Sequence, residues 1–170
     1  MELIKWVDRK FDFSFPAGVF PAILERLSGT PVRLEKILEG IEKDVLIKRY
    51  GTNWSIQEHA GHLLDLDAIH EKRLNQYIAN MTILLPADIT NKKTYLAEHN
   101  SKDIKDILNE FHKARNAFVN KAAGVDEIII TRTAIHSRLN KEMRFVDMLY
   151  FTAEHDDHHL AVIRNLLNRN

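Results

Sequence analysis

The spacing of apolar residues most constrains how this chain of 170 residues can fold. Apolar side chains recur three or four positions apart, as on one face of an α-helix, and only 6 glycines and 4 prolines interrupt them. The pattern predicts four amphipathic segments, covering roughly 20–41, 55–78, 102–123 and 142–167. We therefore expect an all-α fold, an antiparallel four-helix bundle.

Start and stop signals refine the first two segments. Ser28 and Gly29 predict a break, after which Thr30 as N-cap and Pro31 as the first helical residue restart the helix. The second segment opens with the sequence Ser55–Glu58, which fits a capping box.

The later segments are separated by long connections. Ser101 is expected to cap the third helix and Gly124 to end it. Residues 79–101 and 124–141 indicate a departure from the simplest up-down bundle, and Ile128–Ile130 has the character of extended chain.

Composition bounds the function. With 24 basic and 24 acidic residues the formal net charge is zero, which argues against nucleic acid as the main partner. The absence of cysteine excludes disulfides, thiolate ligands and a cysteine nucleophile. The length predicts a single domain, 1–170. No apolar run approaches the roughly 20 residues that span a bilayer, and the first residues have no signal-peptide core, so we expect no membrane association and a cytoplasmic protein.

The first 18 residues form a separate segment, which we call the arm. It ends near Pro16 and is expected to be irregular, packed on the body or on a second subunit. Its aromatic residues are Trp6, Phe11, Phe13 and Phe15.

Nine histidines are many for a chain of this length, and two of them stand out. At about 100° per residue, His155 and His159 lie about 40° apart in the middle of the apolar stripe of the last helix, whereas Asp156 and Asp157 point away from it. Two imidazoles one turn apart can aim at one metal ion. The alternative is a pair of core histidines that hydrogen-bond to carbonyl groups or water.

A third ligand would have to come from a facing helix, and the second helix offers His59 and His62. His59 is nearer the centre of the apolar stripe of its helix, and His62 lies at its edge. Periodicity alone does not choose between them.

Several motifs, taken in order, resemble the DinB-like superfamily. They are Thr30-Pro31-Val32-Arg33-Leu34, Trp54-Ser55-x-x-Glu58-x-x-x-His62-Leu63 and His155-x-x-x-His159. The resemblance implies a four-helix bundle in which His62, His155 and His159 bind a divalent metal, zinc or nickel. It also implies a metal-dependent enzyme acting on a small molecule, either an S-transferase that uses a bacillithiol-type thiol or a hydrolase. A non-catalytic metal-binding stress-response protein is the third alternative. A homodimer is a further expectation from the resemblance, to which the aromatic arm adds a little support.

Other residues have weaker claims to catalysis. Glu58 lies one turn before His62 and could act as a base, although the capping box already explains it. His158 could shuttle protons at the edge of a pocket. Nothing in the sequence places three arginines near the site, although they could approach an anionic substrate: Arg26, Arg33 and Arg73.

Two other metal sites and a serine nucleophile find no support. No glutamate is followed three residues later by histidine, which excludes the di-iron pattern of ferritin-like bundles. The zinc-protease motif H-E-x-x-H and the G-x-S-x-G elbow are also absent.

Overall fold

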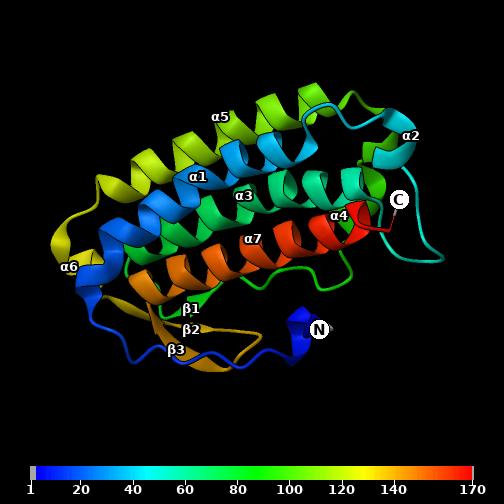
Figure 1. Ribbon diagram of the computed structural model, residues 1–170. Coiled ribbons are helices and arrows are strands. Elements are labelled where there is room, and N and C mark those ends of the chain that lie inside the picture. The colour runs from blue at the N-terminus through cyan, green and yellow to red at the C-terminus, as the bar shows by residue number, and fades with distance from the viewer. Residues whose placement is uncertain (1–2, 170) are drawn as a thin grey trace.

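Four long helices form the body of the protein in the computed structural model, which describes residues 3–169. In chain order they are α1 (Phe20–Leu38), α3 (Ile56–Ile78), α5 (Ile104–Ala123) and α7 (Phe145–Leu167) (Figure 1). In the described part of the chain, no helix is long and apolar enough to cross a membrane.

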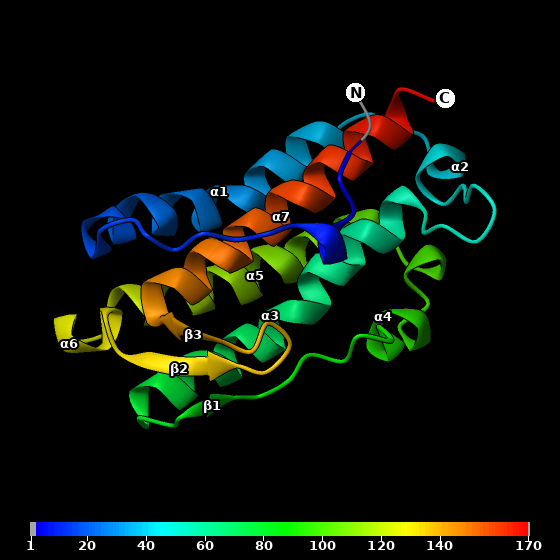
Figure 2. The same cartoon turned by 90° about the horizontal axis from the view of Figure 1, so that it is seen from below.

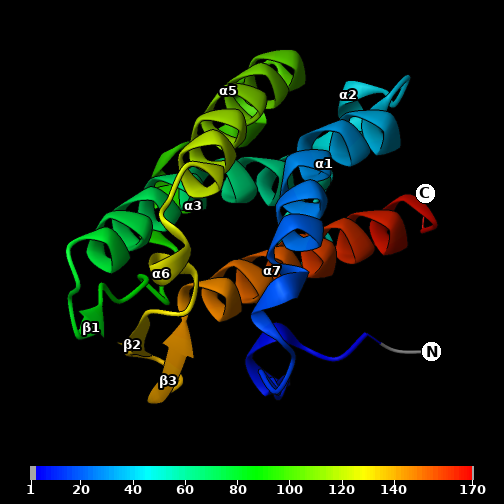
Figure 3. The same cartoon turned by 90° about the vertical axis from the view of Figure 1, so that its left-hand side faces the viewer.

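The four helices do not follow the up-down order. Helix α1 packs against α5 and α7, and α3 packs against the same two helices, so that α1 and α3 occupy opposite corners (Figure 3). Figures 1 and 2 show α1 and α7 running in one direction and α3 and α5 in the other. Each helix therefore has one parallel and one antiparallel neighbour, a departure that the long connections had indicated.

The connection between α3 and α5 follows from this order. Because these neighbours are parallel, the chain must return along the bundle, and a helix of 23 residues is about 35 Å long. The return contains β1 (Ile83–Leu84), α4 (Lys92–Leu96) and the 3₁₀ helix η3 (His99–Ser101).

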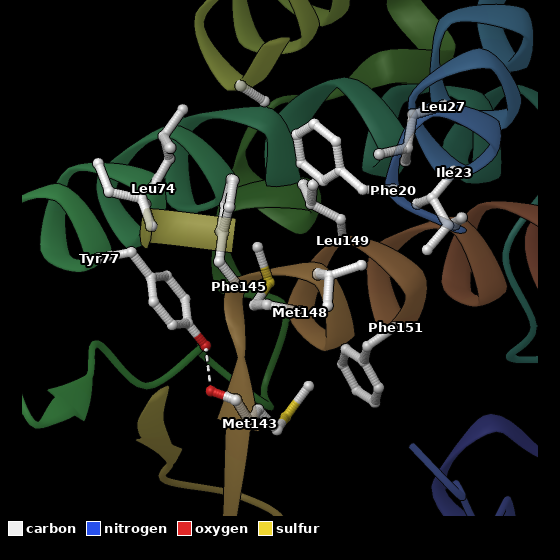
Figure 4. Close-up of a cluster of buried hydrophobic side chains, with 14 of the residues drawn as sticks. Phe20, Ile23, Leu27, Leu74, Tyr77, Met143, Phe145, Met148, Leu149 and Phe151 are labelled. Atoms are coloured by element: carbon white, nitrogen blue, oxygen red, sulfur yellow. Dashed lines mark hydrogen bonds between the residues drawn. The ribbon is translucent and has the colours of Figure 1, made fainter. Parts of the chain in front are cut away.

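The expectation of a purely helical fold is corrected by a small sheet. Strand β1 pairs in parallel with β2 (Thr133–His136), which pairs antiparallel with β3 (Lys141–Arg144). Strands of two to four residues are too short for an alternating pattern to reveal. The Tyr77 hydroxyl donates to the Met143 carbonyl over 3.0 Å and ties α3 to the sheet (Figure 4).

Two predicted helix starts and one predicted extended segment were wrong. Helix α5 begins after Asp103, whose side chain accepts from the Lys105 N–H, so Ser101 is not its cap. Helix α7 begins at Phe145 because the preceding residues pair in β3. The three isoleucines Ile128–Ile130 lie in the short helix α6 (Glu127–Ile130), where only Ile129 is buried.

The predicted break at Ser28 and Gly29, with a restart at Thr30, was also wrong, since α1 continues through Pro31. A proline inside a helix leaves the carbonyl four residues earlier without its usual donor. Here that carbonyl belongs to Leu27, and it accepts from Arg115 Nη1 at 3.4 Å. The Thr30 hydroxyl donates to Asp156 Oδ2 at 2.9 Å instead of capping a helix.

The apolar core falls into two clusters separated by a polar layer. The cluster near the sheet includes Phe20, Tyr77 and Phe145 (Figure 4), and the other includes Leu63 and Phe111. Arginine, aspartate and histidine side chains occupy the middle of the bundle between them.

The arm packs on its own chain and consists of irregular backbone with two 3₁₀ helices, η1 (Trp6–Asp8) and η2 (Ala17–Val19). It runs beside α7 and the sheet (Figure 2). Arg144 Nη2 donates to the carbonyl groups of Phe13 and Phe15, and Lys141 Nζ donates to that of Phe11. A homodimer stays a prediction. The remaining short helix, α2 (Lys43–Leu46), lies between α1 and α3.

Candidate metal centre

The antiparallel helices α3 and α7 bring three histidines together inside the bundle. One ring nitrogen each of His62, His155 and His159 lies within 4.8 Å of the others. All three side chains are buried. The Nε2 atoms of His155 and His159 are 3.2 Å apart, as their separation by one helical turn predicts.

Local contacts fix the start of α3 and hence the position of His62. The predicted capping box is confirmed: Ser55 Oγ accepts from the Glu58 N–H, and Glu58 Oε2 accepts from the Ser55 N–H. Arg49 forms a salt bridge with the same carboxylate. Both oxygens of Glu58 are therefore engaged away from the histidines.

A close approach between α3 and η3 holds the α3–α5 connection against the part of α3 that carries His62. A side chain on Gly61 would collide with His99, since its Cβ would lie 2.2 Å from that ring. His99 Nε2 is 2.8 Å from Asp65 Oδ2. Gly61 thus allows the α3–α5 connection to lie directly over α3, where it contributes Thr94.

Hydrogen bonds engage Nδ1 of both His62 and His159 and leave their Nε2 atoms to bind a metal ion. His62 Nδ1 lies 3.0 Å from Thr94 Oγ1, and His159 Nδ1 lies 2.8 Å from His59 Nδ1. With each Nδ1 engaged in this way, Nε2 is left to bind a metal. His59 thus contacts a predicted ligand from behind, whereas His62 faces the pair.

Burial keeps these imidazoles neutral at pH 7. It lowers the pKa of His62 to about 4, an effect that the charge of Asp65 opposes and that of His99 reinforces. Burial and the neighbouring histidines lower the pKa values of His155 and His159 well below the usual 6.5. Neutral imidazole is the form that binds metal ions.

The donor set fits a divalent metal ion. Nitrogens bound to a tetrahedral zinc at about 2.0–2.1 Å are about 3.3 Å apart, close to the separation of the His155 and His159 Nε2 atoms. His155 Nδ1 is buried and has no hydrogen-bond partner in residues 3–169. Three neutral nitrogen ligands without a fourth protein ligand are typical of catalytic zinc sites.

A cavity of about 150 Å³ adjoins two of the three histidines, His62 and His155. Leu66, Ile69 and Phe151 form apolar parts of its wall. A small molecule in this cavity would lie directly beside the predicted metal ligands.

The remaining predicted residues lie around this centre. His158 is half-buried, with its ring edge-on to His159 at a centroid distance of 5.5 Å. Arg26 and Arg33 do not line the cavity, and both pair with Asp157. Arg73 does line the cavity.

Asp156 points away from the apolar stripe of α7, as predicted, and it is nevertheless buried. It pairs there with Arg115 from α5. Arg115 also pairs with Asp67 on α3 at 2.8 Å. Burial raises the pKa of Asp67 to about 6, although Arg115 opposes the shift. This triad joins three helices directly behind the histidines.

Sequence reasoning missed the contributions of the arm and the connections. Trp6 packs edge-on against His155, Thr94 contacts His62, and His136 and Arg138 line the cavity. Short irregular segments have no periodicity that would reveal which way their side chains point.

Comparison with known families and structures identifies the family and supports the fold. The sequence profile of the DinB superfamily matches residues 26–163. The chain belongs to this superfamily. The resemblance noted in the motifs is thereby confirmed, and the matched region contains His62, His155 and His159.

A solved structure has the same fold as this DinB-superfamily chain. YfiT from Bacillus subtilis, described as a probable metal-dependent hydrolase with an unusual four-helix bundle topology, superposes with a TM-score of 0.81. The match covers 95% of this chain and 93% of YfiT at 16% sequence identity. No curated protein sequence matches significantly.

Proposed function

We propose that the protein is a divalent-metal-dependent enzyme that transfers a low-molecular-weight thiol to an electrophilic small molecule. His62, His155 and His159 would hold the ion, zinc or nickel. The observation that carries the proposal is the set of three neutral imidazoles beside a cavity. A bound divalent ion would supply positive charge that favours the anionic form of a thiol or of water.

The carboxylates near the site favour a thiol over water as the nucleophile. Glu58 is held by Arg49 and Ser55. Asp88, the one carboxylate of the described residues that lines the cavity, accepts hydrogen bonds from the Thr90 hydroxyl and the Thr90 and Lys92 backbone. Neither is free to act as a general base. A thiol, with a pKa of about 8.5, needs such help far less than water does.

The chain supplies the other requirements of this reaction. His158 is half-buried, with its ring 5.5 Å from that of His159, and is the group that would relay the proton that the thiol loses. Leu66, Ile69 and Phe151 limit water in the cavity, which protects the sulfur nucleophile and the electrophile.

A metal-dependent hydrolase is the second candidate. The description of YfiT as a probable metal-dependent hydrolase favours it. It differs from the first proposal in one measurable respect, because a hydrolase consumes its substrate without a thiol.

Turnover by tag-free protein loaded with zinc or nickel tests both functions. L-Cysteine and a fluorogenic alkyl halide provide the S-transfer assay: a C–S bond forms, halide leaves, and the thiol proton passes to the buffer. We expect a metal-dependent rate that is lost in His155→Ala and His155→Gln and retained in His112→Ala, which removes a histidine paired with Glu35 outside the cluster.

A nitrophenyl ester without thiol provides the hydrolase assay. Metal-dependent ester turnover without thiol transfer would favour the hydrolase. Metal-loaded protein inactive in both assays, across a panel of thiols and electrophiles, would contradict the enzymatic proposal.

A further inference from the structure

Arg73 is a buried arginine without a counter-charge. Its side chain lies on α3 and is 2% exposed, yet it forms no salt bridge with any carboxylate of residues 3–169. Its Nε donates to the Leu85 carbonyl at 3.0 Å, and its Nη2 is buried without a partner. Burial lowers the pKa of Arg73 to about 10, which still leaves it charged at pH 7. An unpaired buried charge is costly, so a site of this kind calls for an anion.

His136 adds a second donor without a partner. The Leu139 N–H donates to its Nδ1 at 3.3 Å, so the neutral ring carries its proton on Nε2. This Nε2 atom is buried and has no acceptor in the described chain. Burial and two nearby arginines, Arg73 and Arg138, lower the pKa of His136 to about 4, which keeps the ring neutral at pH 7.

Two further side chains extend the same polar wall. Arg138, in the turn between β2 and β3, lies over the rings of Trp6 and Phe151 at 5.8 and 5.5 Å and forms no salt bridge within residues 3–169. His70 on α3 is buried with both ring nitrogens unpartnered. All four side chains, Arg73, His136, Arg138 and His70, line the cavity that adjoins His62 and His155.

The charge and size of the cavity limit what can fill it. Among residues 3–169, Asp88 is the one carboxylate in the lining, and it accepts hydrogen bonds from Thr90 and Lys92, so two arginines face the cavity without a free carboxylate from this part of the chain. Its volume of about 150 Å³ is below the roughly 300–1,000 Å³ of pockets for whole drug-sized ligands. The space therefore suits a short, acidic part of a molecule.

We infer that this cavity binds a carboxylate group of the substrate, with Arg73 and His136 as its principal donors and Arg138 at its edge. A guanidinium and an imidazole N–H match the two oxygens of a carboxylate. The carboxylate end lies against Arg73 and the reacting end lies toward His155. The placement of the reacting end rests on the proposed function, whereas recognition of the carboxylate does not.

Binding of two matched probes tests the inference. 3-Mercaptopropionate carries a carboxylate where 3-mercaptopropan-1-ol carries a hydroxyl group. Calorimetry with metal-free and zinc-loaded protein should show that the acid binds roughly tenfold or more tightly than the alcohol, as charge-assisted hydrogen bonds predict. The preference should be lost in Arg73→Gln and reduced in His136→Phe.

Arg132→Gln provides the matched control. Arg132 donates to the carbonyl groups of Tyr77 and Ile78 at the end of α3 and does not line the cavity. This variant should keep the preference of the wild-type protein. The melting temperature of Arg73→Gln should not fall below that of the wild type, because an unpaired buried charge is removed; the loss of preference then cannot be attributed to unfolding.

The outcomes separate this inference from the proposed function. Equal binding of acid and alcohol by the wild type, or an unchanged preference in Arg73→Gln, would overturn the inference even if thiol transfer is observed. Inorganic phosphate that displaces the acid at equal concentration would overturn the assignment to a carboxylate. A preference that persists without metal and without turnover would support the inference while the proposed function fails.

Discussion

Two arginines are buried in this bundle, and their surroundings differ in kind. Arg115 is fully buried and pairs with Asp67 and Asp156, and it also donates to the Leu27 carbonyl that Pro31 leaves free. Arg73 is almost as buried but has a single backbone acceptor. The first arginine is satisfied by the protein itself, and the second is not.

The difference separates buried polar groups that stabilise the fold from buried polar groups that are left to bind a ligand. The triad of Arg115, Asp67 and Asp156 joins α3, α5 and α7 and holds α7 in place behind His155. In the cavity that Arg73 lines, Arg73 Nη2 and His136 Nε2 are buried and have no partner in the described chain. A buried charge without a partner is expensive, so its retention indicates a use other than stability.

The largest effect is expected from Arg115→Met. Removal of this guanidinium leaves two aspartates buried without a counter-charge, which typically costs about 3–5 kcal/mol. Urea denaturation should show a loss of this size in the free energy of unfolding. A loss below about 1 kcal/mol would mean that the Arg115 triad does not stabilise the bundle.

A metal should stabilise the protein by a smaller amount. At a free zinc concentration of about 100 times its Kd, the unfolding free energy should rise by about 2.7 kcal/mol, since the ion binds the folded state. The rise should vanish in His155→Gln and persist in His112→Gln. An equal rise in all three proteins would place the zinc elsewhere.

Acid should lower the free energy of unfolding through protonation of His136, which lines the cavity. Because the folded pKa of about 4 is below the usual 6.5, the contribution of this histidine to stability is fully present above about pH 6.5. It is lost as the pH falls towards 4, by up to about 1.4 kcal/mol per pH unit. Denaturation of metal-free wild type and His136→Gln at pH 7, 6 and 5 measures the difference. Identical slopes would show that His136 is not held neutral.

The smallest effect is expected from Arg73→Met, the counterpart of Arg115→Met. Because Arg73 has no counter-charge, its removal should change the unfolding free energy by less than about 1 kcal/mol or increase it. Urea denaturation of Arg73→Met and Arg115→Met side by side compares their unfolding free energies directly. A loss of about 3 kcal/mol in Arg73→Met would mean that the two arginines are alike.

The sequence allowed the helical parts of this account to be predicted. Four amphipathic segments indicated the bundle, the Ser55–Glu58 box fixed the start of α3, and the spacing of His155 and His159 placed them on one face. The selection of His62 over His59 came from the family resemblance and not from periodicity. The metal ligands stay a prediction that the geometry supports.

The remaining features depend on contacts between distant segments. A helical wheel sets Asp156 about 100° from His155 and off the apolar stripe, but it cannot show that Asp156 is buried as well. The sheet was missed because its strands have two to four residues, and with it the position of His136. Arg73 was recognised as a candidate for anion binding, yet only the fold places it beside His155.

The most direct test of the central claim is the metal content of tag-free protein purified without added metal. We predict about one zinc or nickel ion per chain in the wild type and in His112→Ala, and none in His155→Ala or His62→Ala. Wild-type protein that remains without metal after reconstitution, or His155→Ala and His62→Ala variants that retain a full complement, would contradict the three-histidine centre.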